Sequence, residues 1–476
     1  MRTRHPELKG ILGREARQRV HEASLRILET VGIRVDSQES RGYFASAGAM
    51  CDPSTRRVTI PRKIVEKAVE LAPMDVRMCN RAGEVLRLQD GVSLLGSQGS
   101  ALVMFDYESQ CTRPVSEQDV MNFARVADAL SSIQIIQLNG CVAAASPGAA
   151  VLLGIRAVLS STRKHCLAQP LNAQELGSWV GACQQLSPAL ALQEWPILSA
   201  MVSTTSPLCI DSNNAEMIVQ IAKLGIPLVV ISAPLAGATA PFPLSATLAV
   251  LNAEILGTLV LAQAVHPRTP FVYGNAATIM DMSTGRCAYG AIEARLLVSA
   301  VAELARGYHL PLMSAWSGPD SFLPDQQCGI EKASTILVGM LAGVSLWLGA
   351  GGFGTSSVSS LEQLIIDSDL FQSTARLLKG IDVCDRTLSL AVVKSVGPGG
   401  TFLTTPETLE WLRSGEHYHP QVFNRAGPDG PGILARAHEK VRSLLASGTR
   451  QVPQEEVLVL DEFVRAEAER WGVELR

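Results

Sequence analysis

The sequence predicts a (β/α)8 barrel, and three observations lead to that fold class. The first is a regular alternation of short apolar runs with helical stretches, which begins near residue 92. The second is the number of these units, since eight of them over roughly 290 residues match the strand count and usual length of such a barrel. The third is the apolar character of every run, which is expected for strands covered on both faces. A doubly wound parallel sheet shares the alternation and is the alternative fold.

The strands of the barrel are expected at eight short apolar runs, 92–97, 133–138, 165–169, 197–202, 227–231, 270–274, 311–315 and 344–348. Helical periodicity predicts the intervening helices at 116–130, 148–161, 172–186, 213–224, 245–265, 288–306, 326–342 and 360–379. Two of these helices begin at capping sequences. Ser116 has Asp119 three residues on, and Ser360 has Gln363.

Two further segments flank the predicted barrel. At the N-terminus, apolar residues at helical spacing end at Gly32, which favours a left-handed helix end before an extended piece. At the C-terminus, helical patterns recur at 432–446 and 454–470. We therefore divide the chain into an N-terminal helical and extended layer (1–91), the barrel (92–395) and a C-terminal helical extension (396–476).

Composition excludes several classes of protein. The 476 residues are 47% hydrophobic, and a net charge of −4 provides no basic surface for nucleic acid. The cysteines form no C-x-x-C pair, which favours reduced thiols in a cytoplasmic protein over a disulfide framework. His417 and His419 form the only close histidine pair and have no cysteine nearby, so no metal site is expected. The apolar stretch 247–265 contains Glu254, so we expect a buried helix and no contact with a membrane.

The motif Gly349-x-Gly351-x-x-Gly354 follows an apolar run, as the glycines of a dinucleotide-binding loop do. That fingerprint needs its third glycine at the start of a helix and an acidic residue about 20 residues on, at the end of a strand. Here the next helix start, at Ser360, comes six residues after Gly354, and the segment near 374 is still helical. A nicotinamide-dependent oxidoreductase is therefore not expected.

In a (β/α)8 barrel the functional residues follow the carboxyl ends of the strands. The side chains at those positions are rich in amides and hydroxyls, and they include few carboxylates, no histidine and no lysine. General acid–base and nucleophilic catalysis normally recruit histidine, lysine or paired carboxylates. No catalytic residue can therefore be named, and a reaction whose reactive centre comes from a cofactor is favoured. The candidate positions are Gln98, Asn139, Gln169, Asp211, Asn275, Asp281, Trp316, Asp320, Trp347 and Phe353.

Seven motifs in order resemble the trimethylamine methyltransferase family, which includes glycine betaine:corrinoid methyltransferases that lack pyrrolysine. They are "GATAP" (237–241), "NAEIL" (252–256), "VYGNAATIMDMSTG" (272–285), "YGAIEA" (289–294), "PDQQCGIEK" (324–332), "SLEQLIIDSDL" (360–370) and "VGPGGTFL" (396–403). The segment "HEASLRILETVGIRV" (21–35) resembles the N-terminal part of the family. The resemblance therefore runs from about residue 20 to about residue 450.

The resemblance implies a barrel that moves a methyl group from a quaternary (betaine-like) or tertiary amine to the cobalt(I) of a separate corrinoid protein. The cobalamin would be carried by that partner, and none would be bound tightly by this chain. A displacement at carbon with a neutral amine leaving needs in-line positioning and exclusion of water, and it needs no base. The family and the apolar composition also imply a homo-oligomer.

The resemblance gives the candidate positions the role of binding a cationic substrate. Trp316, Trp347, Phe353 and Tyr273 would present aromatic faces, and Asp320 or Asp281 would offset the charge. Structural alternatives remain open for several of these residues. Tyr273 and Trp347 would lie in the core, Asp281 would cap a turn, Asp211 would cap a helix, and Glu254 and Glu331 would be structural carboxylates.

The chain departs from the family pattern at three positions. Members carry a histidine where this chain has Leu348, a glutamate where it has Gly354 and a histidine where it has Thr401. Together with Gly351, these residues are expected to face the corrinoid. The glycines would either widen its approach or mark a site released from the usual chemistry.

At the position of pyrrolysine the chain has only standard residues, so a trimethylamine-specific mechanism is not implied. Two alternatives to methyl transfer from a betaine-like amine stay open. One is a divergent barrel homologue with altered substrate or donor chemistry. The other is a non-catalytic small-amine binding protein.

Overall fold

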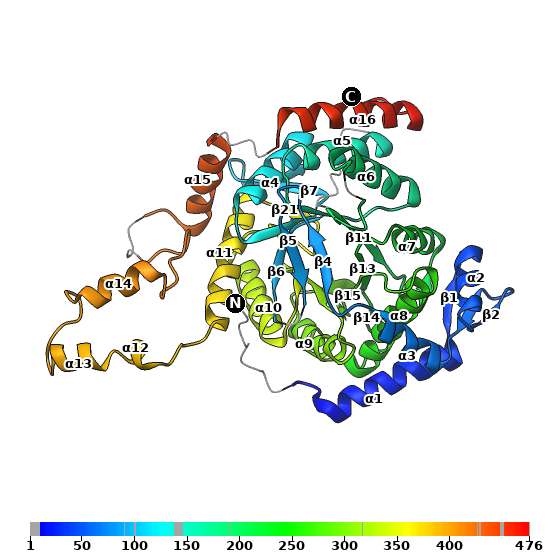
Figure 1. Ribbon diagram of the computed structural model, residues 1–476, viewed down its shortest axis with the longest axis horizontal. Helices are drawn as coiled ribbons and strands as arrows, with labels where there is room; N and C mark the ends of the chain where they lie inside the picture. The colour runs from blue at the N-terminus through cyan, green and yellow to red at the C-terminus, as the bar shows by residue number, and fades with distance from the viewer. Residues whose placement is uncertain are drawn as a thin grey trace.

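Eight parallel strands close into a barrel at the centre of the computed structural model (Figure 1). The structure describes residues 10–89, 91–99, 101–137, 146–189, 191–316, 318–425, 427, 430–447 and 452–475. The barrel strands are β6 (Leu94–Ser97), β9 (Ile133–Ile136), β10 (His165–Ala168), β11 (Leu198–Ser203), β13 (Leu228–Ser232), β15 (Phe271–Asn275), β18 (Leu312–Ala315) and β19 (Leu346–Ala350). Pairing of β19 with β6 closes the ring. The predicted fold class is confirmed, and each expected strand overlaps a strand of the barrel.

One helix follows each barrel strand, and these eight helices cover the outside of the barrel. These helices are α4 (Glu117–Ala129), α5 (Pro147–Leu159), α6 (Ala173–Leu186), α7 (Ser212–Leu224), α8 (Leu244–Val265), α9 (Ile292–Gly307), α10 (Gln326–Ala342) and α11 (Leu361–Leu378). The predicted caps are present, because Ser116 accepts from the amide of Asp119 and Ser360 from that of Gln363. Helix α8 has the length and hydropathy of a membrane span, but 89% of its most apolar window is buried inside the protein. It is a core helix, as predicted.

The N-terminal layer packs beside α8 (Figure 1). Its elements are α1 (Gly13–Arg26), a π-helical turn (Ile27–Val31), α2 (Gln38–Ser46) and α3 (Arg62–Leu71), with β1 (Ile33–Val35), β2 (Met50–Asp52) and β3 (Arg57–Thr59). The strand β1 also pairs with β12 (Cys209–Ile210), which follows β11.

A hairpin of β4 (Val76–Cys79) and β5 (Val85–Leu88) closes one end of the barrel, which is called its lower end below. Its residues Val76, Met78 and Leu88 are buried in one apolar cluster with Leu94 and Leu346, which begin barrel strands. The hairpin therefore lies at the amino ends of the strands and plugs the barrel there (Figure 1).

His165 begins β10 beside this plug and is fully buried. Its Nδ1 lies 2.9 Å from the carbonyl oxygen of Cys79, and its Nε2 lies 2.9 Å from Ser199 Oγ. A carbonyl can only accept, so Nδ1 carries the proton and Nε2 accepts from the hydroxyl. Burial, which disfavours the charged ring, lowers the pKa of His165 to about 4.

This buried histidine should make the protein less stable in acid. Between the unfolded pKa of 6.5 and the folded pKa of about 4, the unfolded chain binds the proton and the folded chain does not. The free energy of unfolding therefore decreases as the pH is lowered through this window, by up to about 3 kcal/mol. Urea unfolding at several pH values between 7 and 4.5 measures this slope. His165→Asn should flatten it, whereas H417Q at an exposed site should not.

A second small sheet lies at the opposite end of the barrel and was not expected from the sequence. The hairpin β7 (Val103–Asp106) and β8 (Cys111–Pro114) follows the first barrel strand, and β20 (Gly352–Phe353) and β21 (Val358–Ser359) follow the last. They join in the order β20-β21-β7-β8. A similar small sheet is formed by β14 (Leu235–Ala236), β16 (Thr278–Asp281) and β17 (Arg286–Ala288). Both sheets lie at the carboxyl ends of the barrel strands.

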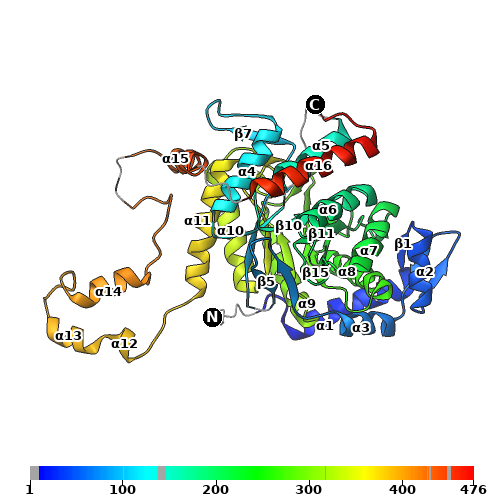
Figure 2. The ribbon, with the colours of Figure 1, turned by 45° about the horizontal axis from the view of Figure 1, so that its top comes forward.

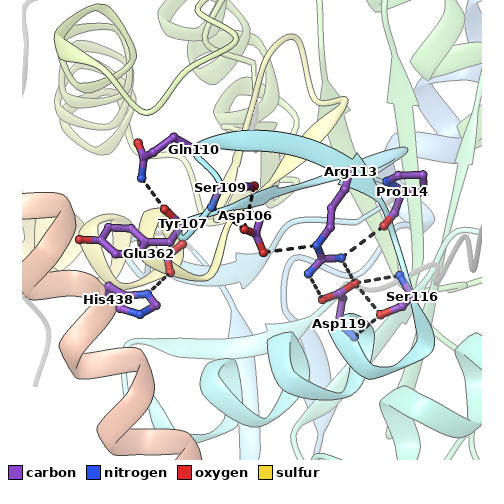
Figure 3. A network of polar contacts seen from close by, with 10 residues as sticks. All are labelled: Asp106, Tyr107, Ser109, Gln110, Arg113, Pro114, Ser116, Asp119, Glu362 and His438. Carbon is purple, nitrogen blue, oxygen red and sulfur yellow. Dashed lines mark hydrogen bonds and ion pairs between the residues drawn. The ribbon is translucent and has the colours of Figure 1, made fainter.

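Polar contacts fix the β7–β8 hairpin on two sides (Figure 3). Arg113 reaches both carboxylate oxygens of Asp119 on α4, at 2.6 and 2.9 Å. On the other side the ring of Tyr107 stacks on His438 of α15 (Ile433–Ala446), with centroids 3.9 Å apart. His438 Nδ1 lies 2.9 Å from Glu362 Oε1 at the start of α11. The hairpin is thus held between the first and last helices of the barrel and α15.

The glycine motif makes a tight turn between β19 and β20. Gly351 is buried at φ +87°, and a Cβ built on it would lie 2.7 Å from the ring of Phe123. Gly354 has φ +57°, and a Cβ there would lie 3.0 Å from Phe322. The next helix, α11, starts only at Leu361. The turn therefore needs glycine for its backbone and for close packing, and it does not open a helix as a dinucleotide loop does.

Gly351→Ala should lower the free energy of unfolding by about 2–3 kcal/mol, since it adds a steric clash to an unfavourable φ. Gly285 provides the control, because it has φ +69° and no atom lies within 4 Å of a Cβ built on it. G285A should cost only about 1 kcal/mol, from the backbone conformation alone. Denaturant unfolding of the two variants measures the difference. Equal losses would contradict the packing role.

The C-terminal part of the chain includes α12 (Asp385–Leu388), α13 (Leu390–Val396), α14 (Pro406–Ser414), α15 and α16 (Gln454–Trp471). Helix α15 packs on α11, and α16 packs on α5 and α6. The two helices predicted at 432–446 and 454–470 are therefore confirmed. Between α11 and α15 the chain leaves the barrel and returns (Figure 1).

Candidate substrate cavity at the barrel mouth

A cavity of about 290 Å³ lies at the carboxyl ends of the barrel strands. Its floor is apolar and includes Met201, Ile231, Met313 and Leu348. Amides and hydroxyls line part of the cavity wall, and aromatic and charged groups line the rest. The volume suits a small molecule and is far too small for a macrocycle.

The polar part of the wall is built from residues at the carboxyl ends of several barrel strands. Gln98 follows β6, and its Nε2 donates to the carbonyl oxygen of Ser356 at 2.8 Å. Gln137 follows β9, and its Nε2 donates to Gln169 Oε1, which follows β10, at 3.3 Å. Asn275 ends β15 and lies in register with Ser314 of β18. Ser314 Oγ is buried and has no hydrogen-bond partner in the structure. This hydroxyl is therefore available to a ligand in the cavity.

Trp316 is one of two aromatic residues that line the cavity, with Tyr289, and it is held by Lys332 of α10. Its indole Nε1 donates to the carbonyl oxygen of Lys332 at 3.0 Å, and Lys332 Nζ donates back to the carbonyl oxygen of Trp316 at 3.2 Å. The ammonium also lies 4.7 Å from the centroid of the indole ring. These contacts fix the ring orientation at the cavity wall.

Lys332 belongs to a buried ion pair below the cavity. Its Nζ lies 2.7 Å from Asp367 Oδ2 on α11, and both side chains are fully buried. The same oxygen accepts from the amide of Gly351 at 2.7 Å, while Asp367 Oδ1 accepts from Gln363 at 2.8 Å. Burial raises the pKa of Asp367, and the neighbouring ammonium opposes this shift. The pair therefore couples α10, α11 and the glycine turn to the wall of the cavity.

The charged wall combines Glu331 of α10 with Arg295 of α9. Glu331 Oε2 accepts from the amide of Asp320 at 2.7 Å, and Oε1 accepts from Gln327 at 2.8 Å. Arg295 donates to backbone oxygens of Tyr289, Ala291 and Glu331. These backbone oxygens carry no formal charge, so they do not neutralise the guanidinium of Arg295. The cavity wall thus carries charges of both signs.

Five of the predicted site residues line this cavity. They are Gln98, Gln169, Asn275 and Trp316 of the substrate set, and Leu348 of the set expected to face the corrinoid. Asn139 lies outside the described residues.

The other carboxylates of the predicted set lie away from the cavity lining. Asp211 is the N-cap of α7 and accepts from the amide of Asn214 at 3.0 Å. Asp281 holds the turn between β16 and β17 and accepts from the amide of Ser283 at 2.8 Å. Asp320 is half-buried next to Glu331, and burial raises its pKa. The capping alternatives therefore describe Asp211 and Asp281.

The remaining aromatic and corrinoid-facing candidates lie outside the cavity lining. Trp347 is in the core, where its ring occupies the space left by Gly339 of α10. Phe353 of β20 packs on Phe105 of β7 in the β20-β21-β7-β8 sheet, with ring centroids 6.2 Å apart. Gly351 and Gly354 are buried in the turn, so they do not widen the mouth. Thr401 is exposed between α13 and α14, beyond the end of α11.

Several cavity residues were missed by reading only the ends of strands. Tyr289, Arg295, Glu331 and Lys332 reach the cavity from helices or their preceding loops. The prediction that no lysine lies at the mouth was therefore wrong, because Lys332 lines the cavity. A charged pair inside apolar helices, Lys332 and Asp367, was the sequence feature that could have revealed it. No group of three metal-ligating side chains occurs among the described residues.

Comparisons with known proteins give one consistent result. A family model described as trimethylamine methyltransferase (MTTB) matches residues 2–465. Trimethylamine methyltransferase MttB of Desulfitobacterium hafniense (strain DSM 10664 / DCB-2) is 28% identical over 468 residues, which cover 95% of this chain and 93% of the relative. The protein of the same name from Methanosarcina thermophila is 31% identical over 439 residues, 90% of each chain.

A glycine betaine methyltransferase of Desulfitobacterium hafniense (strain Y51) is 27% identical over 450 residues, 92% of each chain. The crystal structure of the Methanosarcina barkeri monomethylamine methyltransferase MtmB superposes with a TM-score of 0.55. It is 11% identical, and the match covers 98% of this chain and 89% of that one. At this identity it supports the barrel fold alone.

Proposed function

The chain belongs to the trimethylamine methyltransferase family and is a methyltransferase, and we propose that it demethylates a quaternary, betaine-like or tertiary amine bound in the barrel cavity. The methyl acceptor is the cobalt(I) of a corrinoid that a partner protein carries. The observation that supports this proposal is the cavity itself. It is large enough for one small amine, and its lining includes a tryptophan, a carboxylate and several neutral amides.

The reaction requires positioning more than proton transfer. The C–N bond would break with its electron pair going to nitrogen, and the methyl group would pass to the partner's corrinoid, whose cobalt(I) would supply the electron pair of the new bond. A quaternary donor leaves as a neutral tertiary amine, so no proton has to move. The residues of this chain would bind the ammonium with Trp316 and Glu331, orient its polar part with the amide wall, and exclude water.

The partner would dock on the rim above the cavity. Loops that follow barrel strands expose the apolar side chains of Phe242, Met282 and Leu323, which are 69%, 63% and 54% exposed. Exposed apolar groups beside a functional cavity are typical of a protein-binding surface. The corrin ring would remain outside the 290 Å³ cavity, with the cobalt facing the methyl group. Phe242→Glu should therefore weaken docking of the corrinoid protein without changing amine binding.

A direct assay tests the proposed reaction. The purified chain is mixed with a cobalt(I) corrinoid protein and a panel of quaternary and tertiary amines, and the absorbance change to methylcobalamin is recorded. The proposal expects this change with one amine of the panel. An amine that only raises the melting temperature, without methyl transfer, would instead support a binding protein. Glycine betaine, trimethylamine and their longer homologues are the first donors to compare.

Glu331→Gln should raise the apparent dissociation constant for a quaternary amine about tenfold, because it removes the negative charge of the cavity wall. It should leave the binding of an uncharged isosteric analogue nearly unchanged. Titration calorimetry with both ligands measures the two effects. Glu293→Gln on α9, outside the cavity lining, is the matched control. Equal losses for both ligands would show that Glu331 only supports the fold.

We further propose a cytoplasmic location and a homo-oligomeric assembly. The described cysteines are all free thiols, which suits a reducing compartment. The net charge of −4 provides no footprint for nucleic acid. Fractionation of cells that produce the protein tests the location.

A further inference from the structure

One segment of the chain projects from the barrel, and its helices are not packed against the rest of the protein. After α11, residues 379–417 leave the barrel as an arm that contains α12, α13 and α14 (Figures 1 and 2). None of these three helices contains a buried residue. Helices of 4, 7 and 9 residues are too short to be stable alone in water, so packing must support them.

The arm exposes an unusual number of large apolar side chains. Ile381 is 87% exposed, Leu390 69% and Leu403 86%. Val383, Leu388, Val393, Phe402, Leu409 and Leu412 are each at least 46% exposed. Together they present an apolar area on the order of the roughly 800 Å² that each partner contributes to a stable interface. Patches of this size on soluble proteins mark interaction sites.

Both ends of the arm are fixed to the barrel, so the arm is presented in a defined position. At the root, Arg376 of α11 pairs with Glu416 at 2.9 Å. Just beyond it, Asp369 Oδ2 accepts from the amides of Gln421 and Val422 at 2.9 and 2.8 Å. Within the arm, Arg386 pairs with Glu410 of α14 at 2.5 Å. These contacts hold a loop that is anchored at two points, in contrast to a free tail.

The position of the arm separates it from the cavity. Helix α11 starts at the mouth and runs back along the barrel for 18 residues, a length of about 27 Å. The arm therefore starts at the end of the barrel that the β4–β5 hairpin closes. Figures 1 and 2 show α12 and α13 far from β7 at the mouth. A corrinoid protein that docks over the cavity would leave this surface uncovered.

The charge of the arm suits a second copy of the same chain. Its 39 residues contain four lysines and arginines against five acidic residues, so it has almost no net charge. A strongly charged partner would require the opposite sign on this surface, whereas a self-complementary contact does not. The exposed Leu377 at the end of α11 continues the apolar surface onto the barrel.

From the exposed area, the fixed root, the distance from the mouth and the charge balance, we infer that the arm is an interface between two copies of this chain. Each arm packs its apolar side chains against the arm and the adjoining α11 end of the other copy about a two-fold axis. The inference rests on the proposed self-association and specifies its surface. It is independent of the methyl-transfer reaction.

Sedimentation velocity of the full chain at micromolar concentration tests this interface. Wild type is expected as a multiple of the single chain. The double variant Leu390→Glu/Leu403→Glu should raise the dissociation constant at least 100-fold. The control Leu458→Glu/Val459→Glu, on the exposed face of α16, should not change it. Circular dichroism checks that both variants are folded. A monomeric wild type, or an arm variant that associates like wild type, would overturn the inference.

Cross-linking of mixed isotopic copies locates the contact. Equal amounts of unlabelled and nitrogen-15 protein are treated with a lysine-reactive cross-linker, and Lys394 of α13 should appear in peptides that join the two isotopes. Same-isotope peptides alone would contradict an arm-to-arm contact. If the arm variant loses affinity for the corrinoid protein while wild type stays monomeric, the arm serves that partner and the inference is wrong. Failure of methyl transfer with an intact assembly would bear only on the proposed function.

Discussion

Replacing Lys332 by methionine is expected to lower the free energy of unfolding by about 3–5 kcal/mol, the cost of leaving one member of a buried ion pair without its partner. Asp367 would remain completely buried and would keep only the donors of Gly351 and Gln363. Urea unfolding at neutral pH measures the loss. The effect should exceed that of any exposed charge reversal, because water cannot compensate the carboxylate.

The dependence of this loss on pH distinguishes an ion pair from simple packing. Burial already raises the pKa of Asp367, and removal of Lys332 raises it further. The folded K332M protein would therefore bind a proton at a pH where the unfolded chain does not. Its deficit should be largest near neutral pH and should shrink as the pH falls toward the unfolded pKa of Asp. The double variant K332M/D367N should regain much of the stability. A deficit that is the same at pH 5 and pH 7.5 would contradict this explanation.

Glu254→Ala is expected to cost about 4 kcal/mol, because it leaves several buried donors without an acceptor. The carboxylate accepts from the hydroxyls of Thr204, Ser206 and Ser232 at 2.7, 2.8 and 2.7 Å, and from the amide of Leu208 at 2.8 Å. These donors lie at the ends of β11 and β13 and in the loop before β12, so one side chain of α8 joins neighbouring loops at the mouth.

The magnitude can be measured by denaturant unfolding with Glu216→Ala as the control. Glu216 is exposed on α7, and its loss should change stability by no more than about 0.5 kcal/mol. E254Q should fall between the two, since glutamine keeps one acceptor oxygen but turns an amino group toward the same donors. If E254A proved as stable as E216A, the hydroxyls would have found other acceptors and the structural role would be wrong.

The strands of the barrel could be predicted because each is a local apolar run flanked by helical periodicity. The β20-β21-β7-β8 sheet could not, because β20 and β21 have two residues each and β21 pairs with β7, about 255 positions earlier in the chain. Such pairing depends on the closed barrel, which brings the loops after its first and last strands together. Local hydrophobic patterns do not predict pairing between strands so far apart in the sequence.

The candidate site was predicted in part for a similar reason. Strand ends gave Gln98, Gln169, Asn275 and Trp316, which do line the cavity. Neighbouring positions in a strand point to opposite faces, so Trp347 packs outward against Gly339 while Leu348 points inward. Which of the two faces inward depends on the register with β18 and β6, and one strand alone does not determine it. Lys332 was missed, and Glu331 was given only a structural role, because both enter from a helix.

The hairpin that plugs the lower end of the barrel constrains the order of events in a catalytic cycle. In the part of the chain that the structure describes, the donor and the demethylated amine can exchange with solvent only through the opposite end, where the methyl acceptor has to sit. Steady-state kinetics should accordingly be ordered: the amine enters first, the acceptor protein covers it, and the amine product departs last. Inhibition by that product should then compete with the donor and not with the acceptor protein.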